Sequence, residues 1–340
     1  MKRTRSDFPD FMFIGVICYT FVISARSNMR KLMEQSLTSG TIMRLLKVFF
    51  LCLLLLSGTT AAADTKQISI PLKSDRSRPL IAIIADNAGT ETTDLIVPFG
   101  VLKTANVADV LIVSMQAGPI NLMPDLTIEP DMTIAAFDSI YPEGADILIV
   151  PAMHDNNNKL VIDWVRQQAQ KRTFIAAICE GAWIAARSGV LDGQDATTHW
   201  YALDDIARQF PKTRWVRDKR YIADHYVMTT TGVTASIPAS LALVEAISGS
   251  VNAKVIARKL GVEDWNYAHV SAPFHLTAAH IGLVARNYLS FWKHETLSIP
   301  VAGSFDEIAL ALSADAWSRT YRSQAVAISK SDRVKSRVPH

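Results

Sequence analysis

The sequence has few cysteines, little excess charge and no glycine-rich phosphate loop. Three cysteines among 340 residues are too few for a disulfide scaffold or a four-cysteine zinc site. A net charge of +3 is too small to indicate a nucleic-acid-binding surface. Repeats and low-complexity tracts are also missing, and 49% of the residues are apolar, which excludes a disordered chain. These absences leave a globular protein that is long enough to bury a core.

The first 63 residues account for the net positive charge of the chain. They hold two of the three cysteines, and eight Lys and Arg against three Asp and Glu. Residues 43–63 have the order of a secretory signal, with a basic start at Met43, an apolar run over 48–56 and small residues up to Ala63. The apolar run is about 9 residues, shorter than the roughly 20 that cross a bilayer. We therefore predict cleavage after Ala63 and export, to the periplasm.

A second apolar stretch, over 11–24, precedes Met43. We interpret residues 1–63 as a leader whose true start is Met43, and the alternative is an uncleaved leader that anchors the chain in the membrane. Without the leader, 27 Lys and Arg remain against 29 Asp and Glu, so the net charge becomes about −2 and one cysteine, Cys179, is left. We expect no nucleic-acid partner, and membrane contact only through the leader.

The remaining chain divides into a linker over 64–78, a domain over 79–249 and an extension over 250–340. Within the domain, short apolar runs that predict buried strands alternate with helical patterns. The predicted strands cover 80–85, 109–114, 146–150 and 174–178, and the helices between them cover 92–105 and 158–170. This order predicts an α/β fold, a parallel sheet sandwiched by helices.

A less regular part follows the fourth strand. Runs at 213–217, 220–223 and 227–231 predict a meander, and a helix over 236–248 ends at Gly249. We expect a helical C-terminal extension, with helices over 251–260, 277–292 and 306–325. Such an extension can pack over the domain or build a homodimer interface.

Cys179 gives the strongest chemical signal. An apolar strand runs directly into it, Gly181 follows two residues later, and a helical pattern begins at once. This is the layout of a nucleophile elbow, in which a tight turn exposes the side chain and the helix N-terminus favours a thiolate. Taken alone, an inert buried cysteine would fit the same pattern.

Four stretches of the domain resemble the DJ-1/PfpI family of the class I glutamine amidotransferase-like superfamily. They cover residues 85–98, 177–182, 189–200 and 231–245. They are most similar to the branch that contains isonitrile hydratases and the amidase-like N-terminal domains of AraC-type regulators. The resemblance extends over 79–249 and implies a flavodoxin-like fold.

The resemblance implies roles for three residues. Cys179 falls on the nucleophile of the family, and Asp94 on the carboxylic acid that hydrogen-bonds the nucleophile's sulfur. Glu91 is the local rival of Asp94, which could also be an ordinary first-turn acid. His199 falls on a pocket histidine that orients substrate or water or acts as a base, unless it is only structural. Trp200 is expected to pack the pocket wall.

The chain also departs from the family pattern. Ala152 and Met153 replace two glycines that let a backbone N–H face the nucleophile as part of an oxyanion hole. His154 can project into the same substrate pocket or lie in solvent. Glu180 stands where PfpI-type proteases have histidine, which argues against a protease.

These residues predict a cysteine-dependent hydrolase or lyase that acts on a small molecule. In this prediction Cys179 adds to a carbon of the substrate, Asp94 shuttles the proton, and a backbone N–H near Gly181 and Glu180 in the oxyanion pocket supports the developing charge. The competing hypothesis is a non-catalytic domain that senses a ligand or an oxidant through the same pocket. We expect no cofactor and no metal, because the C-terminal histidines lack acidic or cysteine partners at ligand spacing. Those histidines are His269, His275 and His280.

Overall fold

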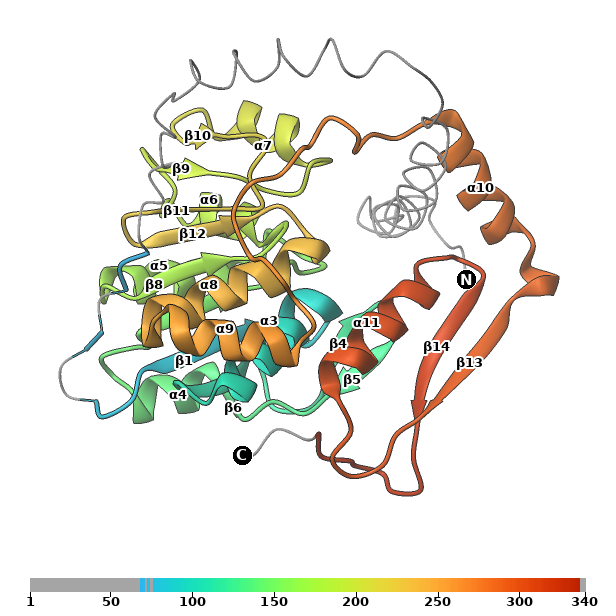
Figure 1. Cartoon of the computed structure of the whole chain (residues 1–340), viewed down its shortest axis with the longest axis horizontal. Coiled ribbons are helices and arrows are strands. Elements are labelled where there is room, and N and C mark those ends of the chain that lie inside the picture. Colours follow the sequence, from blue (N-terminus) through green and yellow to red (C-terminus); the bar gives the residue numbers. More distant parts are fainter. Residues whose placement is uncertain (1–67, 71, 74–75, 337–340) are drawn as a thin grey trace, which may run out of the picture. The chain divides into compact units, whose positions relative to one another are not determined.

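The computed structural model describes residues 68–70, 72–73 and 76–336 (Figure 1). Its centre is a seven-stranded sheet in the order β11-β12-β8-β7-β1-β3-β6. Every neighbouring pair is parallel except β11 and β12. The strands are β1 (Leu80–Ala85), β3 (Asp109–Ser114), β6 (Met132–Thr133), β7 (Ile147–Val150), β8 (Phe174–Ala177), β11 (Tyr221–Asp224) and β12 (Val227–Thr230). The predicted parallel sheet is confirmed.

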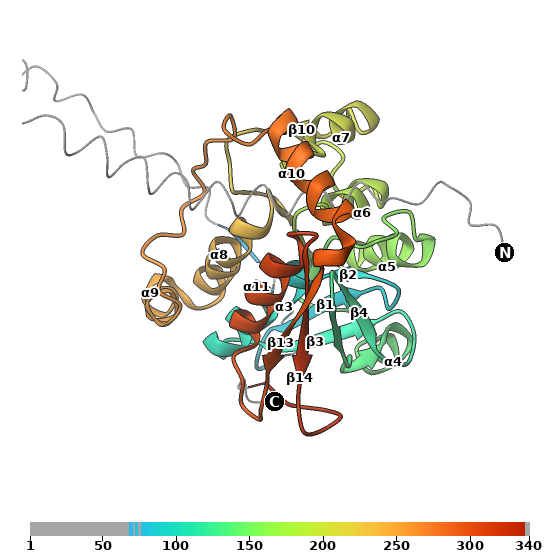
Figure 2. The same ribbon diagram turned by 90° about the vertical axis from the view of Figure 1, so that its right-hand side faces the viewer.

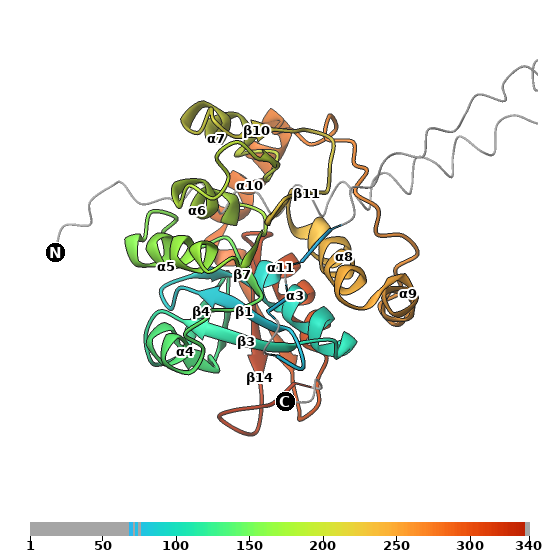
Figure 3. The same cartoon turned by 90° about the vertical axis from the view of Figure 1, so that its left-hand side faces the viewer.

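Helices cover both faces of this sheet (Figure 3). Alternate residues of β1 face opposite clusters, because Ile81 and Ile83 belong to one core and Ala82 and Ile84 to the other. On the side of Ile81 lie α3 (Thr92–Ala105), α8 (Ser236–Ser248) and α9 (Ser250–Lys259). On the side of Ala82 lie α4 (Ile134–Ile140), α5 (Lys159–Gln170) and α6 (Gly181–Arg187).

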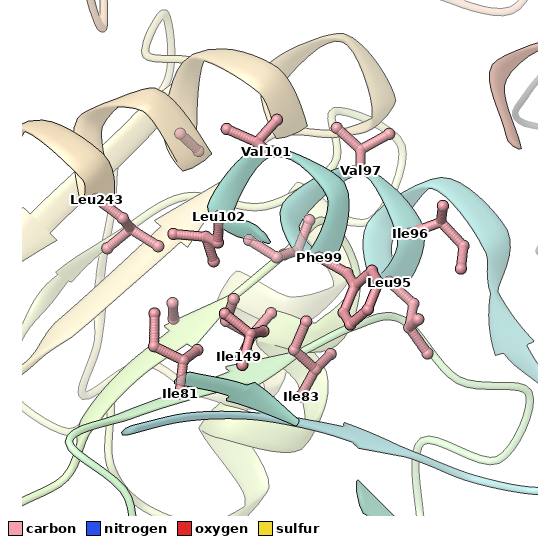
Figure 4. Close-up of a cluster of buried hydrophobic side chains, with 14 of the residues drawn as sticks. Ile81, Ile83, Leu95, Ile96, Val97, Phe99, Val101, Leu102, Ile149 and Leu243 are labelled. Carbon is pink, nitrogen blue, oxygen red and sulfur yellow. The ribbon is translucent and has the colours of Figure 1, made fainter. Parts of the chain in front are cut away.

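The first of these cores holds α3 against the sheet. Leu95, Phe99 and Leu102 of α3 lie over Ile83 and Ile149, as Figure 4 shows. The helix has almost no polar side, and its residues from Thr92 to Leu102 are all buried. A helix that is apolar all round requires cover on its outer side as well.

The predicted meander is only partly correct. β11 and β12 form the expected antiparallel hairpin. Strand β10 (Arg214–Trp215) instead pairs in parallel with β9 (Asp195–Ala196). Helix α7 (Leu203–Gln209) lies between these two strands in the sequence. A further small sheet joins β2 (Thr90–Glu91), β4 (Ile120–Met123) and β5 (Leu126–Ile128).

The C-terminal extension is helical, as predicted, and also contains a pair of parallel strands that the sequence did not predict. Its elements are α9, α10 (Ala278–Leu289), β13 (Glu295–Pro300), α11 (Glu307–Ser318) and β14 (Ser323–Ile328). Helix α11 supplies the outer cover of α3, beside β13 and β14 (Figure 2). The two helices approach closely at Gly100, where a Cβ would lie 2.6 Å from Cγ1 of Ile308.

Part of the predicted linker lies against the domain. The guanidinium of Arg76 pairs with the buried carboxylate of Asp146 at 2.8 Å. Ile68 and Ile70 pack against the core. The leader over 1–63 lies outside the described residues. Among the residues that are described, no helix is long and apolar enough to span a membrane.

Candidate active site

Cys179 lies in the turn between β8 and α6. Its φ of 55° is in the left-handed region, which few residues other than glycine adopt. Its N–H donates to Oγ1 of Thr230 at 3.0 Å, and its carbonyl oxygen accepts from Oγ1 of Thr198 at 2.9 Å. Two neighbouring segments thus hold the strained turn in place, which is the geometry of a nucleophile elbow.

Gly181 gives this turn its shape. A Cβ at this position would lie 2.0 Å from the carbonyl oxygen of Val150, so a larger residue cannot replace it without moving the backbone. Its own N–H donates to the carbonyl of Ile178 at 2.8 Å. Gly181 therefore brings α6 against the end of β7, and its N–H is not free to stabilise an oxyanion.

Asp94 lies in the first turn of α3 and is completely buried. Its Oδ2 accepts the N–H of Ala152 at 3.3 Å, whereas its Oδ1 has no hydrogen-bond partner among the described residues. Burial first, and then the charge of Glu91, raises the pKa of Asp94 well above its usual range. Burial therefore favours the protonated form of this carboxyl, and Oδ1 is the oxygen free to carry the proton.

The Cys179 thiol is 8% exposed and tends to keep its proton. Burial raises its pKa well above the usual value, and the charges of Asp94 and Glu180 raise it further. Hydrogen bonding from the Glu180 backbone lowers it. Burial thus opposes the thiolate that the helix N-terminus was expected to favour.

His199 is buried beside the same sulfur. A Cβ on Gly232 would lie 2.9 Å from Cδ2 of His199 and 3.9 Å from Sγ of Cys179, so both side chains face this glycine. The N–H of Tyr201 donates to Nδ1 of His199 at 3.3 Å. Burial, followed by the charge of Arg319, lowers the pKa of His199 to about 3. The ring is therefore neutral with its hydrogen on Nε2, so it can donate a hydrogen bond but is a poor base.

Trp200 follows His199, and the two rings are 5.2 Å apart. Both line a cavity of about 20 Å³ that Gly232 also borders. This space has room for about one water molecule.

His154 is exposed and lines a cavity of about 510 Å³, which Cys179 and His199 do not border. Arg319 and Tyr288 of the extension line the same cavity. Cavities of this size hold small organic ligands. Ala152, the other residue from the expected oxyanion loop, has its N–H engaged by Asp94.

Arg319 is a site residue that the sequence reasoning missed. Its Nη2 lies 2.7 Å from Oε1 of Glu91, and its Nε lies 2.5 Å from Oδ1 of Asp315. The other oxygen of Glu91 accepts the N–H of Asp94 at 2.6 Å. No local motif marks Arg319, because its partner Glu91 is 228 residues away in the sequence.

Three hydrogen-bond donors remain beside the thiol: the Glu180 N–H, the protonated Asp94 and Nε2 of His199. This set can protonate a substrate and stabilise developing negative charge. In the described part of the chain, no three His, Cys, Asp or Glu side chains are arranged to hold a metal ion.

Comparisons with known proteins agree with this architecture. The DJ-1/PfpI family matches residues 80–246. The isonitrile hydratase of Pseudomonas putida is 29% identical over 171 residues, which cover 49% of this chain and 72% of that enzyme. The HTH-type transcriptional regulator GbdR of Pseudomonas aeruginosa is 30% identical over 83 residues, which cover 24% of this chain and 22% of the regulator.

A solved structure shows the same fold. A THiJ/PfpI family protein from Pseudomonas syringae superposes with a TM-score of 0.50 at 20% identity, over 60% of this chain and 81% of that one. The extension that carries Arg319 lies beyond the family match, which ends at residue 246. Residues 80–246 of this chain therefore form a DJ-1/PfpI family domain.

Proposed function

We propose that this protein is an exported, cysteine-dependent hydrolase or lyase that adds water to a carbon bound to nitrogen, with an isonitrile as the model substrate. The observation that carries the proposal is the pairing of an elbow cysteine with a buried, protonated acid whose Oδ1 has no other described partner. The similarity to isonitrile hydratase supports this choice of substrate class.

The chemistry follows from these protonation states. Asp94 donates its Oδ1 proton to the terminal carbon of the isonitrile while the Cys179 sulfur bonds to that carbon, giving a thioimidate. The thiol proton passes to Asp94 and restores the acid. Water then adds to the same carbon and the C–S bond breaks, which releases an N-substituted formamide and the free thiol. The sum is one isonitrile and one water consumed for one formamide formed.

The other donors assist these steps in the proposal. The Glu180 N–H hydrogen-bonds the sulfur and supports its negative charge as the thiol loses its proton. His199, which is neutral, donates from Nε2 and does not take the thiol proton. The cavity beside His199 has room for the attacking water.

A turnover assay tests the proposal. Purified protein is mixed with an alkyl isonitrile, and the formamide product is measured by mass spectrometry, with an alkyl nitrile and an amide run in parallel. We expect the Cys179→Ala and Asp94→Ala variants to lose at least ~10³-fold of the activity. Full turnover by Cys179→Ala would contradict the role of the cysteine.

A non-catalytic sensing domain is the second candidate. The observation in its favour is that the Ala152 and Gly181 N–H groups are both engaged, which leaves few backbone donors for an oxyanion. The similarity to transcriptional regulators supports the same alternative. A folded protein that turns over none of the three substrate classes would favour it.

A further inference from the structure

Arg319 joins the C-terminal extension to the domain that holds Cys179. It caps the C-terminal end of α11, and its side chain is only 11% exposed. Its guanidinium bonds Glu91 of the domain at 2.7 Å and Asp315 of its own helix at 2.5 Å. A buried arginine that reaches out of the extension and ends on two buried carboxylates is a specific contact, not general cover for α3.

Glu91 links Arg319 to Asp94, because one of its oxygens bonds Arg319 and the other bonds Asp94. Its Oε1 faces Arg319, while its Oε2 accepts the N–H of Asp94 at 2.6 Å and the hydroxyl of Thr93 at 2.9 Å. Asp94 follows Glu91 by less than one helical turn, and the uncompensated charge of Glu91 would oppose ionisation at both Asp94 and Cys179. The positive charge of Arg319, in contrast, lowers the pKa of Asp94.

We propose that the C-terminal extension is a working part of the Cys179 site, because Arg319 fixes the Glu91 carboxylate and balances its charge beside Asp94. Arg319 is a positioning residue, since it acts through Glu91 and Asp94. The inference takes Cys179 from the proposed function as the reacting group, and it requires no particular substrate.

The test is the pH dependence of Cys179 alkylation by iodoacetamide, followed by mass spectrometry. In Arg319→Gln, the charge of Glu91 is unbalanced, so we expect the midpoint of the profile to rise by about 1 pH unit. At a fixed pH below the midpoint, the alkylation rate should then be about tenfold lower than in the wild type. The double variant Glu91→Gln/Arg319→Gln removes both charges. We expect it to return to within about 0.3 units of the wild type.

A second arginine provides the matched control. Arg76 also pairs with a buried carboxylate, Asp146, and its side chain is 15% exposed. Asp146 precedes β7, at the opposite end of the strand from Pro151 and the elbow. Arg76→Gln therefore breaks a similar buried pair, and we expect the midpoint of Cys179 alkylation to stay unchanged.

Thermal unfolding of each variant is measured alongside. If Arg319→Gln does not fold, Glu91→Gln carries the test. This variant removes the negative charge that raises the pKa of Cys179 and leaves that of Arg319, so the midpoint should fall below that of the wild type, and an unchanged midpoint overturns the proposal. An unchanged midpoint in Arg319→Gln overturns the proposal, and so does a shift that the double variant fails to reverse. A shift with reversal supports the proposal even if no substrate is turned over, in which case only the catalytic function fails.

Discussion

Asp94 carries a proton that the native fold retains. An unfolded aspartate loses its proton near pH 4, whereas burial raises the pKa of Asp94 well above that value. The free energy of unfolding therefore falls as pH rises from about 4 towards the raised pKa, because the unfolded chain releases a proton that the native chain keeps. Burial raises the pKa of Asp315 to about 7, so this residue also lowers the free energy of unfolding as pH rises.

The variant Asp94→Asn tests this residue, because an amide cannot ionise. Between pH 5 and pH 8, we expect the melting temperature of the wild type to fall relative to the variant by about 3–6 °C, measured by differential scanning calorimetry. Asp163→Asn is the control, because this partly exposed carboxylate, which bonds Lys159 and Arg166, has a lowered pKa and titrates below the window. Parallel curves for the wild type and Asp94→Asn would contradict a buried, protonated Asp94.

The sequence identified most residues that lie around the thiol, and it did so through the resemblance to the family. Cys179, Asp94 and His199 come from distant segments, yet the structure gathers them around one turn. His154 could not be placed from the sequence, because only the fold shows that it borders another cavity. The protonation states of Asp94, Cys179 and His199 could not be predicted from the sequence either, because they depend on how deeply each group is buried.

At the scale of elements, α3 packs against α11 and so joins the domain to the extension. Gly100→Ala would place a Cβ 2.6 Å from Ile308 and 2.9 Å from the Glu307 carboxylate of α11. We expect this substitution to lower the free energy of unfolding in urea by about 1–3 kcal/mol, because the helices must separate.

Gly282 offers the same substitution without the clash. It lies within α10, and a Cβ there would have nothing within 4 Å. Gly282→Ala should leave the free energy of unfolding unchanged or raise it by about 0.5–1 kcal/mol, as alanine favours helix. Equal gains at both glycines would show that α11 is not held against α3.

Element prediction succeeded where the local pattern decides the structure. The helix expected over 92–105 and the helix expected over 236–248 were found as α3 and α8 with the same bounds. The helix expected over 306–325 ends at Ser318, because the chain turns there through hydrogen bonds from Arg322 and Ser323 to Thr320. Strands β13 and β14 precede and follow α11 and pair with each other in parallel. This pairing was missed although β13 alternates polar and apolar residues.

At the scale of the whole molecule, we propose that the leader determines where the protein works. We predict that the mature protein begins at Asp64, after removal of a signal that starts at Met43. Expression of the full chain with its leader, followed by mass spectrometry of the intact protein and N-terminal sequencing, tests this. A mature chain that still begins at Met1 or Met43 would favour an uncleaved anchor.

The proposed catalysis depends on a covalent bond between Cys179 and the substrate carbon. Rapid-quench mass spectrometry of the intact protein mixed with an alkyl isonitrile measures this bond directly. We predict an adduct of one isonitrile mass on Cys179 that appears before the formamide and decays as water releases it, and that is absent in Cys179→Ala. Formamide release without any adduct on Cys179, or an adduct that never decays to product, would contradict the mechanism.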